Sequence, residues 1–273
     1  MNIDSYIAGY IEGDGYIGIP KYQGEKFKSG IIKNPTIQIS FPTKDLPIAQ
    51  IFLKKIGTGS LLKKKGVNAY ILTFNKKESI LKIIETIRNY MRTPKINSLN
   101  ELINYYKLEE PAILSKTQLT QDAWLAGFID ADGSFQIRST SKTDKRKYDR
   151  LTCSFELSQR NMDKSGDSLN EILKAIGKFL ETEVKLTRRN ELRIKTGSLK
   201  SNKILREYLD RNPILTSKYL DYLDWSRVLK IIEEKKHKTE GGKKEIINYK
   251  SKMNNKRIEY NWNHLTYIWE KLI

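Results

Sequence analysis

The chain has 273 residues, enough for one or two domains with a packed core, and its 50 Lys and Arg against 32 Asp and Glu give a net charge of +18. This excess favours a polyanionic partner, either nucleic acid or an anionic membrane surface, and a ribosomal-type RNA-binding protein would be equally basic. One cysteine and two distant histidines exclude a disulfide framework and a Cys-based zinc site, and they argue against a Ser-His-Asp triad.

The first half of the chain alternates between helical and extended patterns. Apolar spacing and turn residues predict, in chain order, a helix over 4–14, strands over 15–23 and 35–41, a helix over 45–55, strands over 60–65 and 68–75, and helices over 76–90 and 97–109. Asp4 or Ser5 is the expected N-cap of the first helix. Gly66 is the expected turn between the third and fourth strands.

The same order of elements recurs in the second half. The pattern predicts a helix over 121–132, strands over 133–141 and 151–157, a helix over 167–180, strands over 183–189 and 191–196, and helices over 198–210 and 217–235. A basic loop over 141–147 joins the first two of these strands, and Asn190 is the expected turn between the last two. The recurrence indicates an internal repeat.

Matching residues in the two halves keep a nearly constant spacing. Asp132 follows Asp14 by 118 positions, and Lys218 follows Lys95 by 123 positions, so only a few residues are inserted. We predict an α+β fold of two pseudo-symmetric αββαββα repeats, each with a four-stranded antiparallel sheet, packed through their first helices. The predicted parts are an N-terminal repeat over 1–109, a linker over 110–120, a C-terminal repeat over 121–235, and a basic, mostly helical extension over 236–273.

Each repeat begins with a similar nine-residue motif, IAGYIEGDG over 7–15 and LAGFIDADG over 125–133. Gly9 and Gly13 are four positions apart and lie on one helix face, as do Gly127 and Ala131 in the second copy. Small residues at this spacing are common in ordinary core helices. Their repetition, each time before an acid and a glycine, favours a specific close contact between the two helices.

Acidic residues end each motif. We expect Asp14 and Asp132 to meet where the paired helices end, and close carboxylates repel unless a divalent cation lies between them. Carboxylate and carbonyl oxygens suit Mg²⁺, so the carbonyls of Gly13 and Ala131 are further candidate ligands. Such a metal activates water and stabilises charge during phosphodiester hydrolysis. We assign capping or solvated positions to the two other acids, Glu12 and Asp130.

The two motifs resemble those of the LAGLIDADG homing endonucleases, in particular the single-chain members with two motif copies. The second copy differs from the family name at one position, and the first keeps the small residues and the last acid. The resemblance covers about residues 3–235, and the basic extension looks like a tail of some fungal mitochondrial members. It implies a monomeric, intron-encoded enzyme, made inside the mitochondrion, that cuts both strands of double-stranded DNA at a long, specific target. It also implies two or more Mg²⁺ ions, with Mn²⁺ as a substitute, bound by Asp14 and Asp132.

The resemblance also implies further catalytic residues. Lys95, in Thr-Pro-Lys, and Lys218, in Thr-Ser-Lys, look like family lysines that position water or stabilise charge near the metal. On the sequence alone, each would be an ordinary surface lysine. Gln159 resembles a polar residue that supports the site from the end of a strand. Phe41 stands at the matching place in the first half, so we expect unequal chemistry on the two DNA strands.

Alternating polar residues on the predicted strands form the expected DNA-reading face. In the family, two sheets form a saddle over the major groove, where Arg, Lys and Gln can read base edges. Polar sheet faces also face solvent in proteins that bind no DNA. The candidate DNA-binding residues are Gln38, Ser40, Lys63, Lys65, Ser134, Gln136, Arg138, Thr140, Lys185, Thr187, Arg189, Arg193 and Lys195. Because the halves differ, the target should be asymmetric, and salt should weaken binding steeply.

Two other functions fit the same fold. An intron maturase, which assists RNA splicing, would bind intron RNA, and a non-catalytic regulator would bind DNA without needing the acids. Retention of both Asp14 and Asp132 favours the endonuclease over both alternatives. No stretch approaches the roughly 20 apolar residues that span a bilayer, so we expect no membrane partner.

Overall fold

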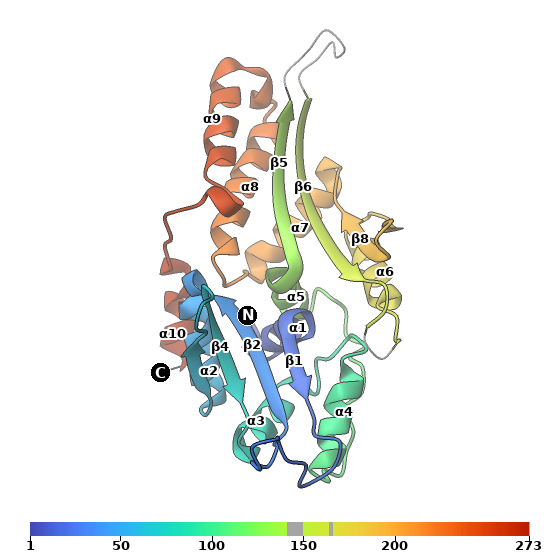
Figure 1. The fold of residues 1–273 in the computed structure, drawn as a ribbon. Helices are drawn as coiled ribbons and strands as arrows, with labels where there is room; N and C mark the ends of the chain where they lie inside the picture. Colours follow the sequence, from blue (N-terminus) through green and yellow to red (C-terminus); the bar gives the residue numbers. More distant parts are fainter. Residues whose placement is uncertain (141–149, 164–165, 273) are drawn as a thin grey trace. The chain divides into compact units, whose positions relative to one another are not determined.

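The computed structural model describes residues 1–140, 150–163 and 166–272 (Figure 1). The chain forms two compact units, the first from residues 1–131 with 262–273 and the second from residues 132–261. The basic loop expected over 141–147 lies outside the described residues. In the part of the chain that the structure describes, no helix is both long and apolar enough to cross a membrane.

The first unit contains a four-stranded antiparallel sheet in the order β1-β2-β4-β3. Its strands are β1 (Gly15–Gly18), β2 (Thr36–Pro42), β3 (Ser60–Lys63) and β4 (Ala69–Phe74). Ile37, Ile39 and Phe41 of β2 are buried, because alternate side chains of a strand point to one face of the sheet. This apolar face is the one on which the helices pack.

Helices cover the apolar face of the first sheet. They are α1 (Ile3–Asp14), α2 (Leu46–Ile56), α3 (Lys77–Ile87) and α4 (Ile96–Tyr105). α1 and α2 contact β2, α3 packs on α1, and α4 contacts β1. The rings of Tyr10, Phe41 and Phe52 meet at centroid distances of 5.4, 5.4 and 5.7 Å. These rings join α1, β2 and α2 into one core.

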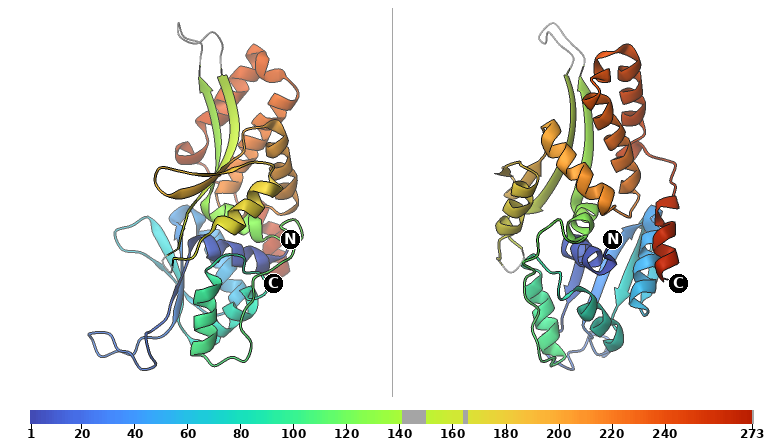
Figure 2. Two further views of the ribbon diagram at one scale, coloured as in Figure 1. Left: turned by 90° about the vertical axis from the view of Figure 1, so that its right-hand side faces the viewer. Right: turned by 180° about the vertical axis from the view of Figure 1, so that it is seen from behind.

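The second unit repeats this topology with the strand order β5-β6-β8-β7. Its strands are β5 (Gly133–Thr140), β6 (Arg150–Arg160), β7 (Val184–Leu186) and β8 (Glu191–Lys195). Its first helices are α6 (Asn170–Phe179), α7 (Leu199–Arg211) and α8 (Lys218–Glu233), of which α8 packs on β5 and β6 and α6 on β7 and β8 (Figure 2). The predicted duplication and fold class are confirmed.

An aromatic cluster forms the core of the second unit. The Phe135 ring lies 5.3 Å from that of Trp225 and 5.5 Å from that of Phe155. The Trp225 indole N–H donates to the Ser154 carbonyl at 3.1 Å, so this buried polar group has a partner. The turn between β7 and β8 contains Asn190 with φ of 58°, a left-handed conformation that asparagine tolerates, and the predicted turn there is confirmed.

The second motif helix is α5 (Trp124–Asp132), and its residues up to Ala131 belong to the first unit. This helix packs against α1. A Cβ atom on Gly9 would lie 1.9 Å from the Trp124 carbonyl oxygen, and one on Gly127 would lie 2.0 Å from that of Tyr6. The two backbones therefore touch at these glycines, where no side chain fits. The predicted close contact between the motif helices is confirmed.

The residues after α8 belong partly to each unit. α9 (Glu240–Ser251) packs on α8, and Arg257 pairs with Asp221 and Asp224 of α8 at 2.9 and 2.6 Å. α10 (Thr266–Leu272) lies beside α2 (Figure 1), where the Lys54 ammonium is 5.6 Å from the Trp269 ring centre. The basic extension is therefore built into the structure of each unit.

The structure differs from the sequence-based expectations at some element ends. Asn2, rather than Asp4 or Ser5, caps α1, because its side-chain oxygen accepts their N–H groups at 3.0 and 3.2 Å. β1 ends at Gly18 instead of continuing to 23, because a proline follows that cannot donate to a ladder. β6 runs to Arg160, beyond its predicted end at 157. The prediction stopped too early because the last residues of β6 are mostly polar and hide the alternation of apolar residues.

Replacing Gly9 by alanine should force α1 and α5 apart, because the new methyl group would lie 1.9 Å from a backbone oxygen. We expect the free energy of unfolding to fall by about 3 kcal/mol or more, at the upper end of overpacking, because backbone rather than a side chain must move. Urea unfolding followed by circular dichroism measures this loss.

Gly241→Ala in α9 is the matched control for this substitution. A Cβ atom at Gly241 meets nothing within 4 Å. Alanine there should leave stability unchanged or raise it by up to about 1 kcal/mol through helix propensity. If Gly9→Ala were as stable as the wild type, the close contact of the two helices would be wrong.

Candidate active site and nucleic-acid interface

The end of α1 holds a lysine ammonium group. The Lys95 Nζ donates to the carbonyls of Ile11 and Gly15 at 2.8 and 2.7 Å. The Ile11 carbonyl also accepts the Gly15 N–H, and the end of the helix carries the negative end of the helix dipole. The end of α1, where Gly13 and Asp14 lie, therefore attracts positive charge.

Lys95 and Lys218 have the same backbone setting in their own units. The Lys95 N–H donates to Thr93 Oγ1 at 3.2 Å, and the Lys218 N–H donates to Thr216 Oγ1 at 3.2 Å. Each lysine stands at the start of a helix, Lys95 before α4 and Lys218 at the first residue of α8. The matched offset in the sequence therefore reflects a repeated local structure.

Glu12 and Asp130 are buried, at 4% and 2% exposure, in contrast to the capping or solvated positions expected for them. Asp130 accepts the Tyr6 hydroxyl. Glu12 accepts three N–H groups, from Arg92, Thr93 and the Trp124 indole. The two helices cross at Gly9 and Gly127. Each acid lies three residues after the glycine of its own helix, and it meets the aromatic residue that lies three residues before the glycine of the other helix. The sequence of one helix alone holds no signal for this exchange.

Asp132 ends α5 and is supported by an amide of the second unit. Gln159 Nε2 donates to Asp132 Oδ2 at 2.7 Å, so the structure brings these two predicted site residues together. Phe41 is at the matching position of the first unit, where it is buried and stacks on Tyr10 at 5.4 Å. A phenyl ring cannot donate this hydrogen bond, so the residue at the matching strand position of the first unit does not repeat it.

The oxygen donors of the two motifs suit a hard divalent cation. Asp14 and Asp132 offer carboxylates, and Gly13 and Ala131 offer carbonyls in the last turn of their helices. Within residues 1–140, 150–163 and 166–272, no group of three or more His, Cys, Asp or Glu side chains could hold a metal.

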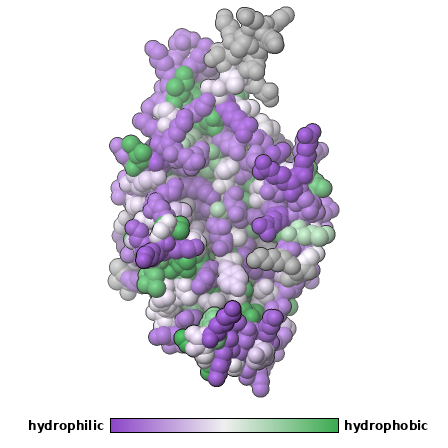
Figure 3. All heavy atoms as spheres, viewed as in Figure 1, coloured by the Kyte–Doolittle hydropathy of each residue, from purple (hydrophilic) through white to green (hydrophobic). Residues whose placement is uncertain are grey.

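The face of the second sheet that points away from its helices is polar and basic. β5 alternates buried Phe135 and Ile137 with polar residues on this face, among them Ser134 and Gln136. The face is hollowed, and five predicted DNA-binding residues line the hollow, namely Arg138, Thr140, Lys185, Arg193 and Lys195. Hydrophilic residues also predominate on the side of the molecule that Figure 3 draws, where apolar residues form small separate groups.

Some side chains on this polar face already have partners. Lys195 Nζ lies 3.0 Å from Glu156 Oε2, and the Arg138 guanidinium donates to Gln136 Oε1 at 2.9 Å. Thr187 and Arg189 follow β7 in the turn to β8, where Thr187 Oγ1 accepts the Glu191 N–H at 3.2 Å. The Thr187 hydroxyl therefore stabilises the turn, whereas Arg189 is exposed at its tip.

The matching face of the first sheet is less basic. Gln38 and Ser40 lie on it, and Gln38 pairs with the half-exposed Tyr16. Gln38 Nε2 donates to Thr73 Oγ1 at 3.4 Å. Lys65 lies in the turn between β3 and β4 and is exposed. This face therefore presents fewer cations than the face of the second sheet.

Lys63 lies on the other side of the first sheet from its expected place. The register pairs Leu61 with the buried Leu72, so Lys63, two residues on, points to the side where α2 contacts β3 and β4. Leu62 occupies the open face instead. Leu61 and Leu62 are adjacent and equally apolar, so the sequence alone could not show which of them faces the core.

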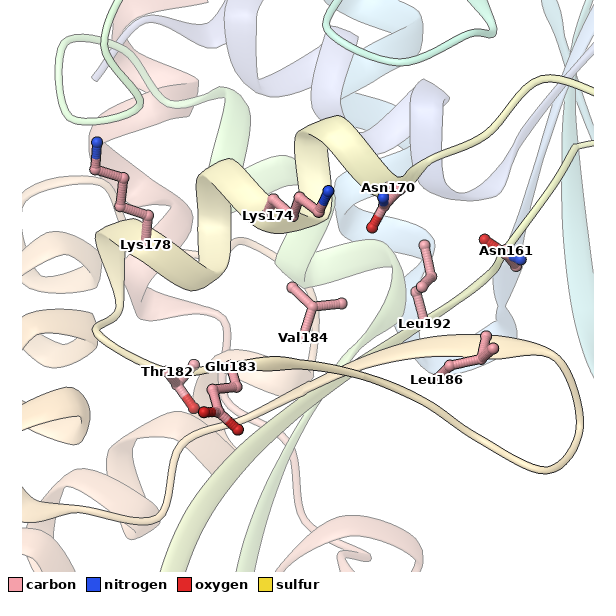
Figure 4. A pocket seen from close by; sticks show the side chains of 9 residues that line it. All are labelled: Asn161, Asn170, Lys174, Lys178, Thr182, Glu183, Val184, Leu186 and Leu192. Atoms are coloured by element: carbon pink, nitrogen blue, oxygen red, sulfur yellow. The ribbon is translucent and has the colours of Figure 1, made fainter.

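A second hollow lies between α6 and the β7–β8 hairpin (Figure 4). Val184 and Leu192 point toward α6, while Lys174 and Lys178 of α6 line the hollow. Leu186 also lines it and is 62% exposed, because β7 is the edge strand of the sheet. This hollow is on the helix side of the sheet, away from the basic face.

A model of the LAGLIDADG endonuclease family matches the chain twice, over residues 7–106 and 125–229. Each match contains one motif, one sheet and the helices that follow it. Since the two matches cover most of the chain, the protein belongs to the LAGLIDADG endonuclease family.

Relatives and solved structures agree with this assignment. The intron-encoded DNA endonuclease aI3 of Saccharomyces cerevisiae is 27% identical over 307 residues, which cover 97% of this chain and 73% of that protein. The intron-encoded RNA maturase bI4 of the same yeast is 30% identical over 146 residues, which cover 52% of this chain and 20% of that protein. A structure of I-SmaMI bound to an uncleaved DNA target in the presence of calcium ions has a TM-score of 0.71, 20% identity, and coverage of 92% of this chain and 98% of that one, which shows the same fold.

Burial raises the pKa of the Glu12 carboxyl from 4.5 to about 7, because lost hydration outweighs the hydrogen bonds from Thr93, Trp124 and Arg92. The folded protein therefore binds this proton more tightly than the unfolded chain. Stability should fall as pH rises from about 4.5 to about 7 and level off above, with a total loss of about 3 kcal/mol from this group.

Urea unfolding in EDTA between pH 5 and 8 measures this dependence. Glu12→Gln cannot titrate, so its stability should lack the part of the pH slope that Glu12 contributes. Other groups titrate equally in both proteins and cancel in the difference. Parallel pH profiles for the wild type and Glu12→Gln would contradict the raised pKa.

Proposed function

We propose that this protein is a site-specific homing endonuclease that hydrolyses both strands of a long, asymmetric double-stranded DNA target with divalent metal ions. The observation that carries the proposal is the crossing of α1 and α5 at Gly9 and Gly127, since each of these helices ends in the aspartate of its family motif. The relative aI3 is named an intron-encoded DNA endonuclease, and the I-SmaMI structure contains a DNA target.

Asp14 and Asp132 are the proposed metal ligands, assisted by the carbonyls of Gly13 and Ala131. The hard oxygen donors favour Mg²⁺, with two or more ions bound and Mn²⁺ as a substitute. The calcium ions present with I-SmaMI support a divalent cation in this fold. When bound, the metal lowers the pKa of the attacking water and stabilises charge on the phosphate.

Three other side chains have proposed roles around these ligands. Lys95 and Lys218 supply positive charge that stabilises the developing negative charge or orients water. Gln159 holds one oxygen of Asp132 through its 2.7 Å hydrogen bond and so fixes the direction of the other. Since Phe41 cannot do this in the first unit, we propose that the two DNA strands are cut at different rates.

The open sheet faces are the proposed DNA-binding surfaces. A β-sheet face fits the major groove, where Arg and Lys suit guanine and Gln suits adenine. The exposed, basic side of the second sheet supports this role, and Lys63 is left out because of its register. The proposed DNA-binding residues are Gln38, Ser40, Lys65, Ser134, Gln136, Arg138, Thr140, Lys185, Thr187, Arg189, Arg193 and Lys195.

The duplication supports action as a monomer, because one chain supplies both motif aspartates. The relatives aI3 and bI4 are named as intron-encoded, and we propose that this protein is likewise encoded in an intron and made inside the mitochondrion. The similarity to bI4 also supports RNA maturase activity as a second function, in which structured intron RNA is the polyanionic partner.

Asp14→Asn and Asp132→Asn should each abolish double-strand cleavage, with a fall in rate of about 100-fold or more, and should leave DNA binding intact. EDTA should have the same effect on the wild type. Gel electrophoresis of a labelled target measures cleavage, and fluorescence anisotropy measures binding. Glu85→Gln, which removes an exposed acid of α3, is the matched control. Cleavage at the wild-type rate by both Asp variants would contradict the site assignment.

Lys185→Gln combined with Arg193→Gln should weaken DNA binding and make it less dependent on salt. Each phosphate contact that is lost should reduce the slope of log Kd against log salt by about 1. Anisotropy titrations at several salt concentrations measure the slope. Lys174→Gln, on the α6 side of the same sheet, removes a charge without touching the basic face and should leave the slope unchanged. Equal effects of the two changes would argue against DNA on the open face.

A further inference from the structure

The segment over 91–95, which carries Lys95, is held from the α1 side by one carboxylate. Both oxygens of Glu12 lie 3.0 Å from the Arg92 backbone nitrogen, and the Thr93 N–H donates to the same side chain. Thr93 in turn accepts the Lys95 N–H through its hydroxyl at 3.2 Å. The backbone of this segment is therefore fixed to α1 two residues before the lysine.

The linker side holds the same segment through the Arg92 side chain. The guanidinium pairs with Asp122 Oδ2 at 2.8 Å and donates to the Thr117 carbonyl at 2.6 Å. The Ser115 N–H also donates to the Met91 carbonyl at 2.8 Å. The linker therefore does more than connect the repeats, because it fixes the position of this segment.

Trp124 closes these contacts into a ring of buried groups. Its indole N–H donates to Glu12, and its backbone N–H donates to Asp122 Oδ1 at 3.0 Å. The Arg92 guanidinium lies 5.6 Å from the centre of the Trp124 ring. Glu12, Arg92 and Asp122 are each less than 10% exposed, so water scarcely competes for these bonds. The ring joins the end of α1, the segment over 91–95 and the start of α5.

The two oxygens of Glu12 accept all the N–H donors that converge on it. Three N–H groups, from Arg92, Thr93 and Trp124, point at its two oxygens. A glutamine offers one accepting oxygen, and its amino group would face an N–H donor. A buried donor left without an acceptor costs more than an ordinary hydrogen bond contributes, so the segment would shift.

We propose that Glu12 is a positioning residue, which fixes the segment over 91–95 so that the Lys95 ammonium stays on the Ile11 and Gly15 carbonyls. This inference rests on the proposed function, because Lys95 is taken to act in DNA cleavage. Glu12 acts through the Thr93 backbone and hydroxyl, and not on the reacting atoms. Its loss should therefore reproduce the loss of Lys95 without removing the lysine.

The test is a double-mutant cycle on single-turnover cleavage with Mg²⁺ at saturating DNA, with each strand labelled separately. Lys95→Met should slow cleavage of one strand by about 100-fold, the lower range for a group that assists proton transfer. Glu12→Gln should slow the same strand by about 10-fold or more and change the Kd for DNA by less than about 3-fold. Adding Lys95→Met to Glu12→Gln should then slow cleavage much less than adding it to the wild type, because a displaced lysine already contributes little to the rate.

A rescue variant and a control separate positioning from general stability. Trp124→Phe removes one of the three donors. In the double variant Glu12→Gln with Trp124→Phe, the glutamine can turn its oxygen to Arg92 and Thr93, so this variant should recover most of the lost cleavage rate. Ser5→Ala removes a 3.0 Å hydrogen bond to the Ala123 N–H at the other end of the same helix pair. It should lower the thermal midpoint without a selective effect on one strand.

Independent, multiplicative effects of the Glu12 and Lys95 substitutions would overturn the proposal, and so would equal slowing of both strands by Glu12→Gln. An unchanged rate for Glu12→Gln beside a slow Lys95→Met would overturn it while leaving the proposed function intact. An unchanged rate for Lys95→Met would show that Lys95 has no catalytic role, and the positioning role proposed for Glu12 would then be wrong as well. If the wild type did not cleave DNA, the proposed function itself would fail.

Discussion

The contact of two helix backbones at Gly9 and Gly127 constrains the rest of the structure. Helices this close leave no room for side chains at the crossing, so the groups on either side of it must pair across the interface. Tyr6 with Asp130 and Trp124 with Glu12 are such pairs, and they place two acids in the interior with hydrogen-bond partners. The chain passes directly from α5 into β5, the first strand of the second unit.

The duplicated fold has diverged in its chemistry. The second unit supports Asp132 through Gln159 and presents a basic, hollowed sheet face, whereas the first unit has a buried phenyl ring at the matching strand position and fewer cations on its open face. The first unit instead has a closed ring of buried, hydrogen-bonded groups around the segment that carries Lys95. These differences are the basis of the proposal that the two DNA strands are cut at different rates.

Much of the fold could be predicted from the sequence, because apolar alternation marks the strands and the constant offsets reveal the repeat. The motif glycines likewise predicted the helix contact. What failed depends on which groups meet in space. The burial of Glu12 and Asp130 follows from where two distant helices cross, the position of Lys63 depends on which of two adjacent leucines faces the core, and the cap by Asn2 depends on where the first turn begins. The ring around Arg92 joins residues more than 100 positions apart, which no local pattern encodes.

The most direct test of this account is sequencing of the DNA ends that the protein produces. The purified chain would be incubated with a randomised double-stranded DNA library, once with Mg²⁺ and once with EDTA. The account predicts ends that form only with Mg²⁺ and that cluster on both strands at one long, asymmetric sequence. Absence of such ends, in a library deep enough to contain a target and with tight binding to structured intron RNA, would contradict the endonuclease and favour the maturase.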